Sequence, residues 1–245
     1  IREFAETIKG IQMSQVIDIG IAILIYILFR CLSKSLAYMT VRIFKPKTKN
    51  KKEIRKNALD KNIPIMQDEG IEFLLNFIKS NNIENILEVG TAVGYSAIRM
   101  ASISPLIKVT SIERDSTRYM EAVKNIAKEH LEDRITLIFK DAIDVEFDKN
   151  TKFDLIFIDA AKGKNTDFFQ KFQKYLKPNG YIITDNLKFH GCVDKPLEEI
   201  ESRNVRGLVR KIRSYIEFLK SNEEFETEFY DVGDGVSVSR RKSND

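Results

Sequence analysis

Three oxygen-bearing side chains stand directly after two apolar segments of this sequence. Asp159 follows residues 153–158, and the pair Asp185-Asn186 follows residues 181–184. Two carboxylates and an amide form an all-oxygen ligand set that suits a hard divalent cation such as Mg2+. If both segments are strands of an open α/β sheet, these side chains lie in the ligand crevice at the carboxyl ends of the strands. Taken singly, each residue also fits a cap of the helix that follows a strand.

A glycine-containing turn lies upstream, between an apolar segment that ends at Val89 and a helical pattern that begins near Gly94. Its spacing, Glu88-x-Gly90-x-x-x-Gly94, differs from the Gly-x-Gly-x-x-Gly of a pyrophosphate cradle. Gly90 permits a tight turn and a close backbone approach, and the following helix offers free N–H groups. A carboxylate at Glu88 suits a ligand with a positive charge and an amino acid moiety. S-adenosylmethionine has both.

Acidic residues also follow the next two apolar segments. Glu113 ends the segment 108–112, where a carboxylate can accept hydrogen bonds from ribose hydroxyls. Asp141 and Ala142 follow the segment 135–139, at a position where an adenine edge could be read. The ordered series of glycines and acidic residues at successive strand ends predicts a class I methyltransferase fold.

These segments resemble the cation-dependent O-methyltransferases, the family of the catechol and caffeoyl-CoA methyltransferases. The resemblance covers roughly residues 62–241, and within the family it is nearest to the bacterial tRNA 5-hydroxyuridine methyltransferases. The motifs that carry it are Ile63-Pro64-Ile65-Met66, the segment Gly90–Met100, Asp159-Ala160-Ala161-Lys162-Gly163, Asp185-Asn186 and Val232-Gly233-Asp234-Gly235. Two departures concern the acceptor pocket: Asn165 replaces an expected aromatic residue, and residues 187–191 replace a shorter apolar segment.

The resemblance implies a role for each matching residue. Asp159, Asp185 and Asn186 would bind the metal, and Lys162 would act in catalysis together with Asp159. With the glycine turn included, the residues expected to contact S-adenosylmethionine are Met66, Glu88, Gly90, Thr91, Gly94, Ser96, Glu113, Asp141, Ala142 and Asp159. A bound Mg2+ would lower the pKa of an acceptor hydroxyl and orient it. Lys162 would then take the proton or hold the oxyanion during in-line methyl transfer.

The expected reaction is therefore Mg2+-dependent methylation of a hydroxyl, with 5-hydroxyuridine in tRNA as the leading acceptor and 5-methoxyuridine as the product. Methylation of a small catechol, phenol or CoA-linked phenol is the alternative. A second alternative is a membrane-tethered module that binds S-adenosylmethionine without turnover.

The distribution of charge bears on the acceptor more than its total does. Lys and Arg number 40 and Asp and Glu number 36, and the resulting net charge of +4 is too small to indicate a nucleic-acid-binding protein. Four arginines are spaced by three, four and three residues, which places them on one face of a helix. Such a stripe suits RNA phosphates, although an ordinary solvated face is the alternative. The four are Arg203, Arg206, Arg210 and Arg213.

The few histidines and cysteines of the sequence argue against a zinc site and against a disulfide framework. His190 and Cys192 lie close to Asn186, but two His and two Cys residues scattered along the chain lack zinc-ligand spacing. We expect both to flank the acceptor pocket as loop residues. Cys31 is far away in the sequence, so there is no disulfide framework, and a reducing cytoplasm fits.

The N-terminal quarter differs from the rest of the chain. Residues 16–29 are apolar except for Asp18 and Gly20, and basic residues dominate from Arg30 to Lys56. Positive charge beside an apolar segment marks the cytoplasmic side, which predicts a membrane anchor with a cytoplasmic catalytic domain. A helix packed on a partner, or on its twin in a homodimer, is the alternative. The predicted divisions are residues 1–44 for this segment, 45–61 for a basic linker and 62–245 for the methyltransferase domain.

The domain itself is expected to contain a single sheet. Its length, about 185 residues, is ordinary for one domain. From the first strand pattern, which ends at Val89, strand and helix patterns alternate along the chain as far as residues 181–184. This alternation predicts a Rossmann-like α/β fold with parallel strands. Two further segments, 226–231 and 236–240, flank Gly233-Asp234-Gly235 and predict an antiparallel hairpin. The expected architecture is a mostly parallel seven-stranded sheet with a terminal antiparallel hairpin, plus an N-terminal apolar helix.

Overall fold

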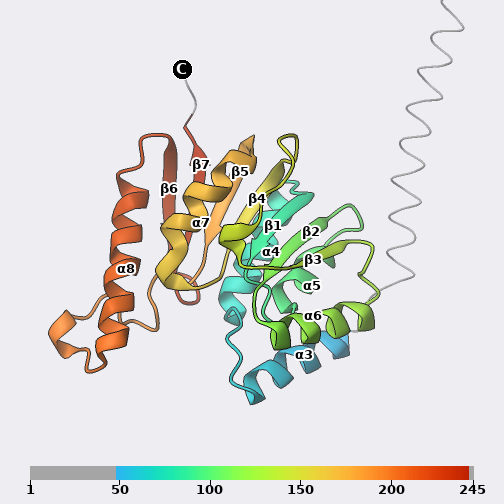
Figure 1. Cartoon of the computed structure of the whole chain (residues 1–245), viewed down its shortest axis with the longest axis horizontal. Coiled ribbons are helices and arrows are strands. Elements are labelled where there is room, and N and C mark those ends of the chain that lie inside the picture. The colour runs from blue at the N-terminus through green and yellow to red at the C-terminus, as the bar shows by residue number, and fades with distance from the viewer. Residues whose placement is uncertain (1–47, 243–245) are drawn as a thin grey trace, which may run out of the picture. The chain divides into compact units, whose positions relative to one another are not determined.

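A computed structural model describes residues 48–242, which contain a seven-stranded sheet in the order β3-β2-β1-β4-β5-β7-β6 (Figure 1). The first five strands are parallel, and β7 runs antiparallel to both β5 and β6. This arrangement confirms the predicted class I methyltransferase fold with its terminal hairpin. The strands are β1 (Asn85–Val89), β2 (Lys108–Glu113), β3 (Ile135–Phe139), β4 (Phe153–Ile158), β5 (Leu176–Thr184), β6 (Phe225–Tyr230) and β7 (Val236–Arg241).

Helices cover both faces of this sheet. Successive strand residues point to opposite faces, and they divide accordingly between two buried clusters. Ile86 belongs to the cluster that also contains side chains of α3, α4, α5 and α6, whereas Leu87 belongs to the cluster with α7 and α8. The helices are α3 (Thr48–Asp60), α4 (Asp68–Ser80), α5 (Tyr95–Ala101), α6 (Ser116–Lys128), α7 (Asn165–Phe172) and α8 (Arg203–Lys220). Short 3-10 turns are η1 (Ala142–Asp144), η2 (Lys162–Lys164), η3 (Gln173–Tyr175) and η4 (Leu197–Glu199).

Side-chain caps fix where two of the longer helices begin. Asp115 accepts a hydrogen bond from the backbone N–H of Arg118 at 2.9 Å, so α6 starts directly after β2. Ser202 caps α8 in the same way through the N–H of Val205. Each cap satisfies a backbone donor that a helix N-terminus leaves without an intrahelical partner.

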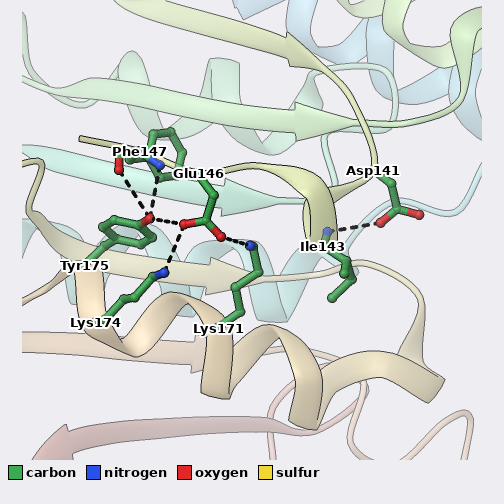
Figure 2. A network of polar contacts seen from close by, with 7 residues as sticks. All are labelled: Asp141, Ile143, Glu146, Phe147, Lys171, Lys174 and Tyr175. Carbon is green, nitrogen blue, oxygen red and sulfur yellow. Dashed lines mark hydrogen bonds and ion pairs between the residues drawn. The ribbon is translucent and has the colours of Figure 1, made fainter. Parts of the chain in front are cut away.

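The segment between η1 and β4 is held to α7 and η3 by one carboxylate (Figure 2). Glu146 accepts hydrogen bonds from Lys171 Nζ at 2.5 Å, Tyr175 Oη at 2.7 Å and Lys174 Nζ at 2.9 Å. The Lys171 contact is the largest of the causes that lower the pKa of Glu146 to about 2. This network connects the chain just past the end of β3 to the helix that follows β4.

The predicted linker over residues 45–61 is wrong for most of its length, because residues 48–60 form helix α3. Ile54 and Ala58 are spaced by one helical turn, and both are buried in the core cluster against α5. Arg55 Nε also lies 2.6 Å from Asp68 Oδ1 at the start of α4. Three apolar residues in this strongly charged segment give almost no periodicity, and only two of them, Ile54 and Ala58, are buried against the domain.

The predicted membrane anchor and N-terminal helix, residues 1–44, lie outside the described residues, as does Cys31. Among the helices of residues 48–242, none combines the length and apolar character that a membrane span requires. Cys192 has a free thiol.

Candidate active site

A cavity of about 290 Å3 opens at the carboxyl ends of β1, β2 and β4. Most of the residues predicted to contact S-adenosylmethionine line it, and Lys162 stands among them. The predicted residues in its wall are Met66, Gly90, Thr91, Ser96, Glu113, Asp141, Ala142 and Asp159. Glu88 and Gly94 are not in the wall, and neither are Asp185 and Asn186.

Gly90 lines the cavity and also packs against the backbone at the end of β4, where there is no room for a side chain. Its φ is +106°, and a Cβ there would come within 2.2 Å of the carbonyl oxygen of Asp159. Because only glycine tolerates both the conformation and the contact, the turn after β1 packs directly on the end of β4. Gly94 has φ +83° at the start of α5, where it ends the turn behind the cavity wall.

Glu88 lies one layer behind the cavity rather than in it. Its carboxyl group is fully buried and accepts hydrogen bonds from the hydroxyls of Ser96 and Ser111. Burial is the main cause that raises the pKa of Glu88 to about 8. Ser111 also lies within hydrogen-bonding distance of Thr91 Oγ1, at 2.5 Å. Glu88 therefore positions Ser96 and, through Ser111, Thr91, and both of those residues line the cavity.

The carboxylate of Glu113 is largely committed to the backbone. Oε2 accepts from the N–H of Ala92 at 2.8 Å, and Oε1 accepts from the N–H groups of Arg114 and Asp115, both at 2.9 Å. A carboxylate has roughly four acceptor positions, so about one remains for a ligand hydroxyl. Glu113 thus ties the glycine turn to the end of β2 and leaves limited capacity for the expected ribose contacts.

Asp141 forms the far wall of the cavity. Oδ1 accepts from the N–H of Ile143 at 3.1 Å, as Figure 2 shows, and Oδ2 accepts from Arg114 Nη1 at 3.1 Å. The Ile143 contact is the first of the causes that lower the pKa of Asp141. The side chain is therefore an oriented acceptor beside the buried Ala142.

Asp159 and Lys162 form an ion pair at the edge of the cavity. Lys162 Nζ lies 2.7 Å from Asp159 Oδ1, and both side chains are less than one fifth exposed. Backbone hydrogen bonds fix the position of Asp159, whose N–H donates to the carbonyl of Val89 at 2.9 Å. The N–H of Asp185 donates in the same way to Ile158 at 3.1 Å, so the three strand ends stand side by side.

The carboxylate of Asp185 is only partly hydrogen-bonded. It is buried, and its Oδ1 accepts no hydrogen bond from the described residues, while Oδ2 accepts from Asn186 Nδ2 at 3.0 Å. Burial, and secondarily the negative charge of Asp159, raise the pKa of Asp185 to about 7. Oxygens of Asp159, Asp185 and the Asn186 carbonyl fit a hard divalent cation at this position. Within residues 48–242 no group of three or more His, Cys, Asp or Glu side chains is placed to bind a metal, and the predicted set has only two carboxylates beside its amide.

Sequence reasoning missed a further acidic residue, Asp234, in the turn between β6 and β7. It is buried, its Oδ1 accepts from the N–H of His190 at 2.6 Å, and its carbonyl accepts from the N–H of Lys188 at 2.8 Å. Asn186 and His190 have φ of +65° and +55°, respectively. The turn thus holds a strained segment that begins at a predicted metal ligand. The Val232–Gly235 motif carries part of the family resemblance and predicts the hairpin, but the sequence gives Asp234 itself no role in the site.

The arginine stripe on α8 is only half available. Arg206 donates to the carbonyls of Ile200 and Glu201, at 2.6 and 3.1 Å. Arg213 donates to Val193 through Nε and Nη2, and to Lys195 at 2.5 Å. These two arginines tie down the segment that leads into α8, so some of their donors are already used within the chain, and their contact with RNA stays a prediction. Arg203 and Arg210 are exposed.

Comparison with known proteins agrees with this geometry, since residues 45–242 match the pattern of the O-methyltransferase family. The chain belongs to the O-methyltransferase family. A caffeoyl-CoA O-methyltransferase of Populus kitakamiensis is 32% identical over 180 residues, which cover 71% of this chain and 76% of that protein.

Solved structures of relatives resemble this chain over most of its length. A Staphylococcus aureus protein assigned to the caffeoyl-CoA O-methyltransferases shares 34% identity at a TM-score of 0.75, over 84% of this methyltransferase and 99% of that chain. An O-methyltransferase of Bacillus cereus in complex with S-adenosylhomocysteine shares 25% identity at a TM-score of 0.68, over 85% and 97%. This methyltransferase therefore uses S-adenosylmethionine as its methyl donor, and its individual donor contacts stay predictions.

Proposed function

We propose that this methyltransferase transfers the methyl group of S-adenosylmethionine to an acceptor hydroxyl held beside Asp159 and Lys162, and that the acceptor is 5-hydroxyuridine in tRNA. One observation carries the reaction type: the Asp159–Lys162 ion pair, at 2.7 Å, stands on the cavity edge next to the unpartnered Oδ1 of Asp185. A site with two carboxylates and one ammonium calls for a further positive charge. Mg2+ on Asp159, Asp185 and Asn186 would supply it.

The chemistry divides among these residues. A bound Mg2+ supplies Lewis acidity that lowers the pKa of the acceptor hydroxyl. Asp159 orients Lys162, whose Nζ accepts the hydroxyl proton as a neutral amine or stabilises the oxyanion as an ammonium. The cavity wall holds the donor so that the acceptor oxygen attacks the methyl carbon in line as the carbon–sulfur bond breaks. The neutral thioether S-adenosylhomocysteine is the second product.

Two observations support tRNA as the acceptor. The motifs at 63–66, 90–100 and 232–235 resemble those of the tRNA 5-hydroxyuridine methyltransferases. Arg203 and Arg210 are exposed on α8, and Lys211, on the same helix, lies against η2 next to Lys162. A phenol or a CoA-linked phenol is the second candidate, which is favoured by the caffeoyl-CoA names of two relatives.

The decisive assay uses the full chain, labelled S-adenosylmethionine and tRNA from cells that cannot methylate hydroxyuridine. We expect EDTA-sensitive label in the 5-methoxyuridine fraction of nucleoside digests. Unmodified tRNA, which lacks the hydroxyl, is the matched control and should take up no label. Transfer to caffeoyl-CoA without transfer to RNA would replace the tRNA proposal with the second candidate. Donor binding without transfer to any acceptor would indicate the inactive module.

A further inference from the structure

The mouth of the donor cavity has basic side chains on two sides, and most of them lie outside the predicted arginine stripe. Arg118 and Lys140 are part of the cavity wall, where Arg118 projects from α6 and Lys140 follows β3. On the other side, Lys162 and Lys164 belong to η2. The cavity mouth therefore lies between two groups of cations.

Helix α8 continues the second group. A Cβ on Gly163 would lie 3.1 Å from Lys211 Cδ and 3.5 Å from its Nζ, so the Lys211 side chain lies over η2. Gly163 leaves the space for it. The helix thus brings one more cation to the side of the cavity where the Asp159–Lys162 pair stands.

Asp141 connects the two sides. Arg114 is paired with it at 3.1 Å, and Lys164 contributes to lowering its pKa, which places the Lys164 ammonium near the same carboxylate. Arg114 and Lys162 are each paired with an aspartate. The other basic side chains form no ion pair within the described part of the chain. We call Arg118, Lys140, Lys164 and Lys211 the basic track.

We propose that the basic track binds the phosphate backbone of an RNA acceptor as it crosses the cavity mouth, so that one base enters beside Lys162. This inference rests on the proposed function, because it assigns how the RNA is held. Cations on both sides of the reacting position suit a chain with a phosphate at every nucleotide. A small phenol has no such requirement, and phosphates position an RNA without reading its sequence.

The test compares two double variants of the full chain. Lys164→Glu/Lys211→Glu changes the track at residues outside the cavity wall. Lys79→Glu/Lys149→Glu is the control, since these exposed lysines precede β1 and β4 at the opposite edge of the sheet. Both variants change the net charge equally. Binding of a fluorescent RNA hairpin with a uridine-rich loop is measured at several KCl concentrations, and S-adenosylmethionine binding is measured by calorimetry.

We expect the track variant to bind the hairpin about tenfold more weakly, with a salt slope that falls by roughly 1.4 to 1.8, because two phosphate contacts are lost. Donor affinity should stay within twofold of wild type in both variants. Equal RNA affinity in the two variants, with the wild-type chain still methylating tRNA, would overturn the track and leave the proposed function intact. A wild-type chain that neither binds nor methylates RNA would overturn both. A raised KM of the track variant for a CoA-linked phenol, with no effect on RNA, would assign these cations to the CoA phosphates instead.

Discussion

The donor and acceptor halves of the site differ in how completely the protein satisfies its own polar groups. On the donor side, Glu88 and Glu113 are buried, and each accepts at least two hydrogen bonds from the chain. On the proposed acceptor side, Asp185 and Asp234 are also buried, yet among residues 48–242 each has one carboxylate oxygen that accepts no hydrogen bond. Buried polar atoms in proteins are nearly always paired, so these two oxygens are where we expect a further partner to bind.

The largest effect is expected where the two halves meet. Asp159→Ala removes both the partner of Lys162 and a predicted metal ligand, so methyl transfer should fall at least about 100-fold. Donor affinity, measured by calorimetry, should fall far less, because most of the cavity wall is unchanged. Asp133→Ala, an exposed aspartate elsewhere in the fold, is the control. Wild-type rates in Asp159→Ala would remove the metal-assisted mechanism.

A backbone substitution tests how rigid the donor half is. Gly90→Ala combines a left-handed φ with a 2.2 Å contact to Asp159, and it should lower the free energy of unfolding by about 3 kcal/mol. Gly207→Ala, in the middle of α8 with open space around it, is the matched control and should raise stability by up to about 1 kcal/mol. Urea denaturation measures both. Similar stabilities for the two variants would mean that the turn adapts without strain.

Glu88 gives the donor half a dependence on pH. Its pKa in the folded protein is about 8, against an ordinary value of 4.5, so between these pH values the folded chain holds a proton that the unfolded chain has released. The free energy of unfolding should therefore fall as pH rises through this window. Glu88→Gln does not lose stability in this way, and its stability relative to wild type should grow by about 3 kcal/mol between about pH 5 and pH 8. Parallel pH profiles of the two proteins would contradict a buried, protonated Glu88.

The smallest effect concerns the acceptor half. Asp234→Ala frees the segment that begins at Asn186, and Mn2+ affinity, with Mn2+ replacing Mg2+, should fall about tenfold while donor affinity stays unchanged. Asp231→Ala is the control, because this exposed residue of the same turn pairs with Lys188 and forms no other ion pair among the described residues. Electron paramagnetic resonance of free Mn2+ gives both affinities. Equal Mn2+ binding in the two variants would mean that Asp234 only shapes the hairpin.

The sequence predicts some residues of the site better than others. Gly90, Glu113 and Asp159 stand at strand ends, and strand ends are readable because apolar segments stop there. The sequence does not predict that Glu88 lies behind the cavity wall, because that position depends on the face of β1 to which its side chain points. Helical spacing likewise places Arg206 and Arg213 on one face of α8 without revealing the carbonyls that occupy them. Contacts between distant segments decide such cases.

Helix α3 sets the limit of the smallest stable piece of this enzyme. Ile54 and Ala58 are buried against the domain, and Pro64, Ile65 and Met66, which line the cavity, follow shortly after the helix ends. A shortened protein that starts at residue 62 would uncover apolar surface on α5 and release the chain just before the cavity wall. Truncation for crystallisation or binding studies should therefore keep helix α3 complete.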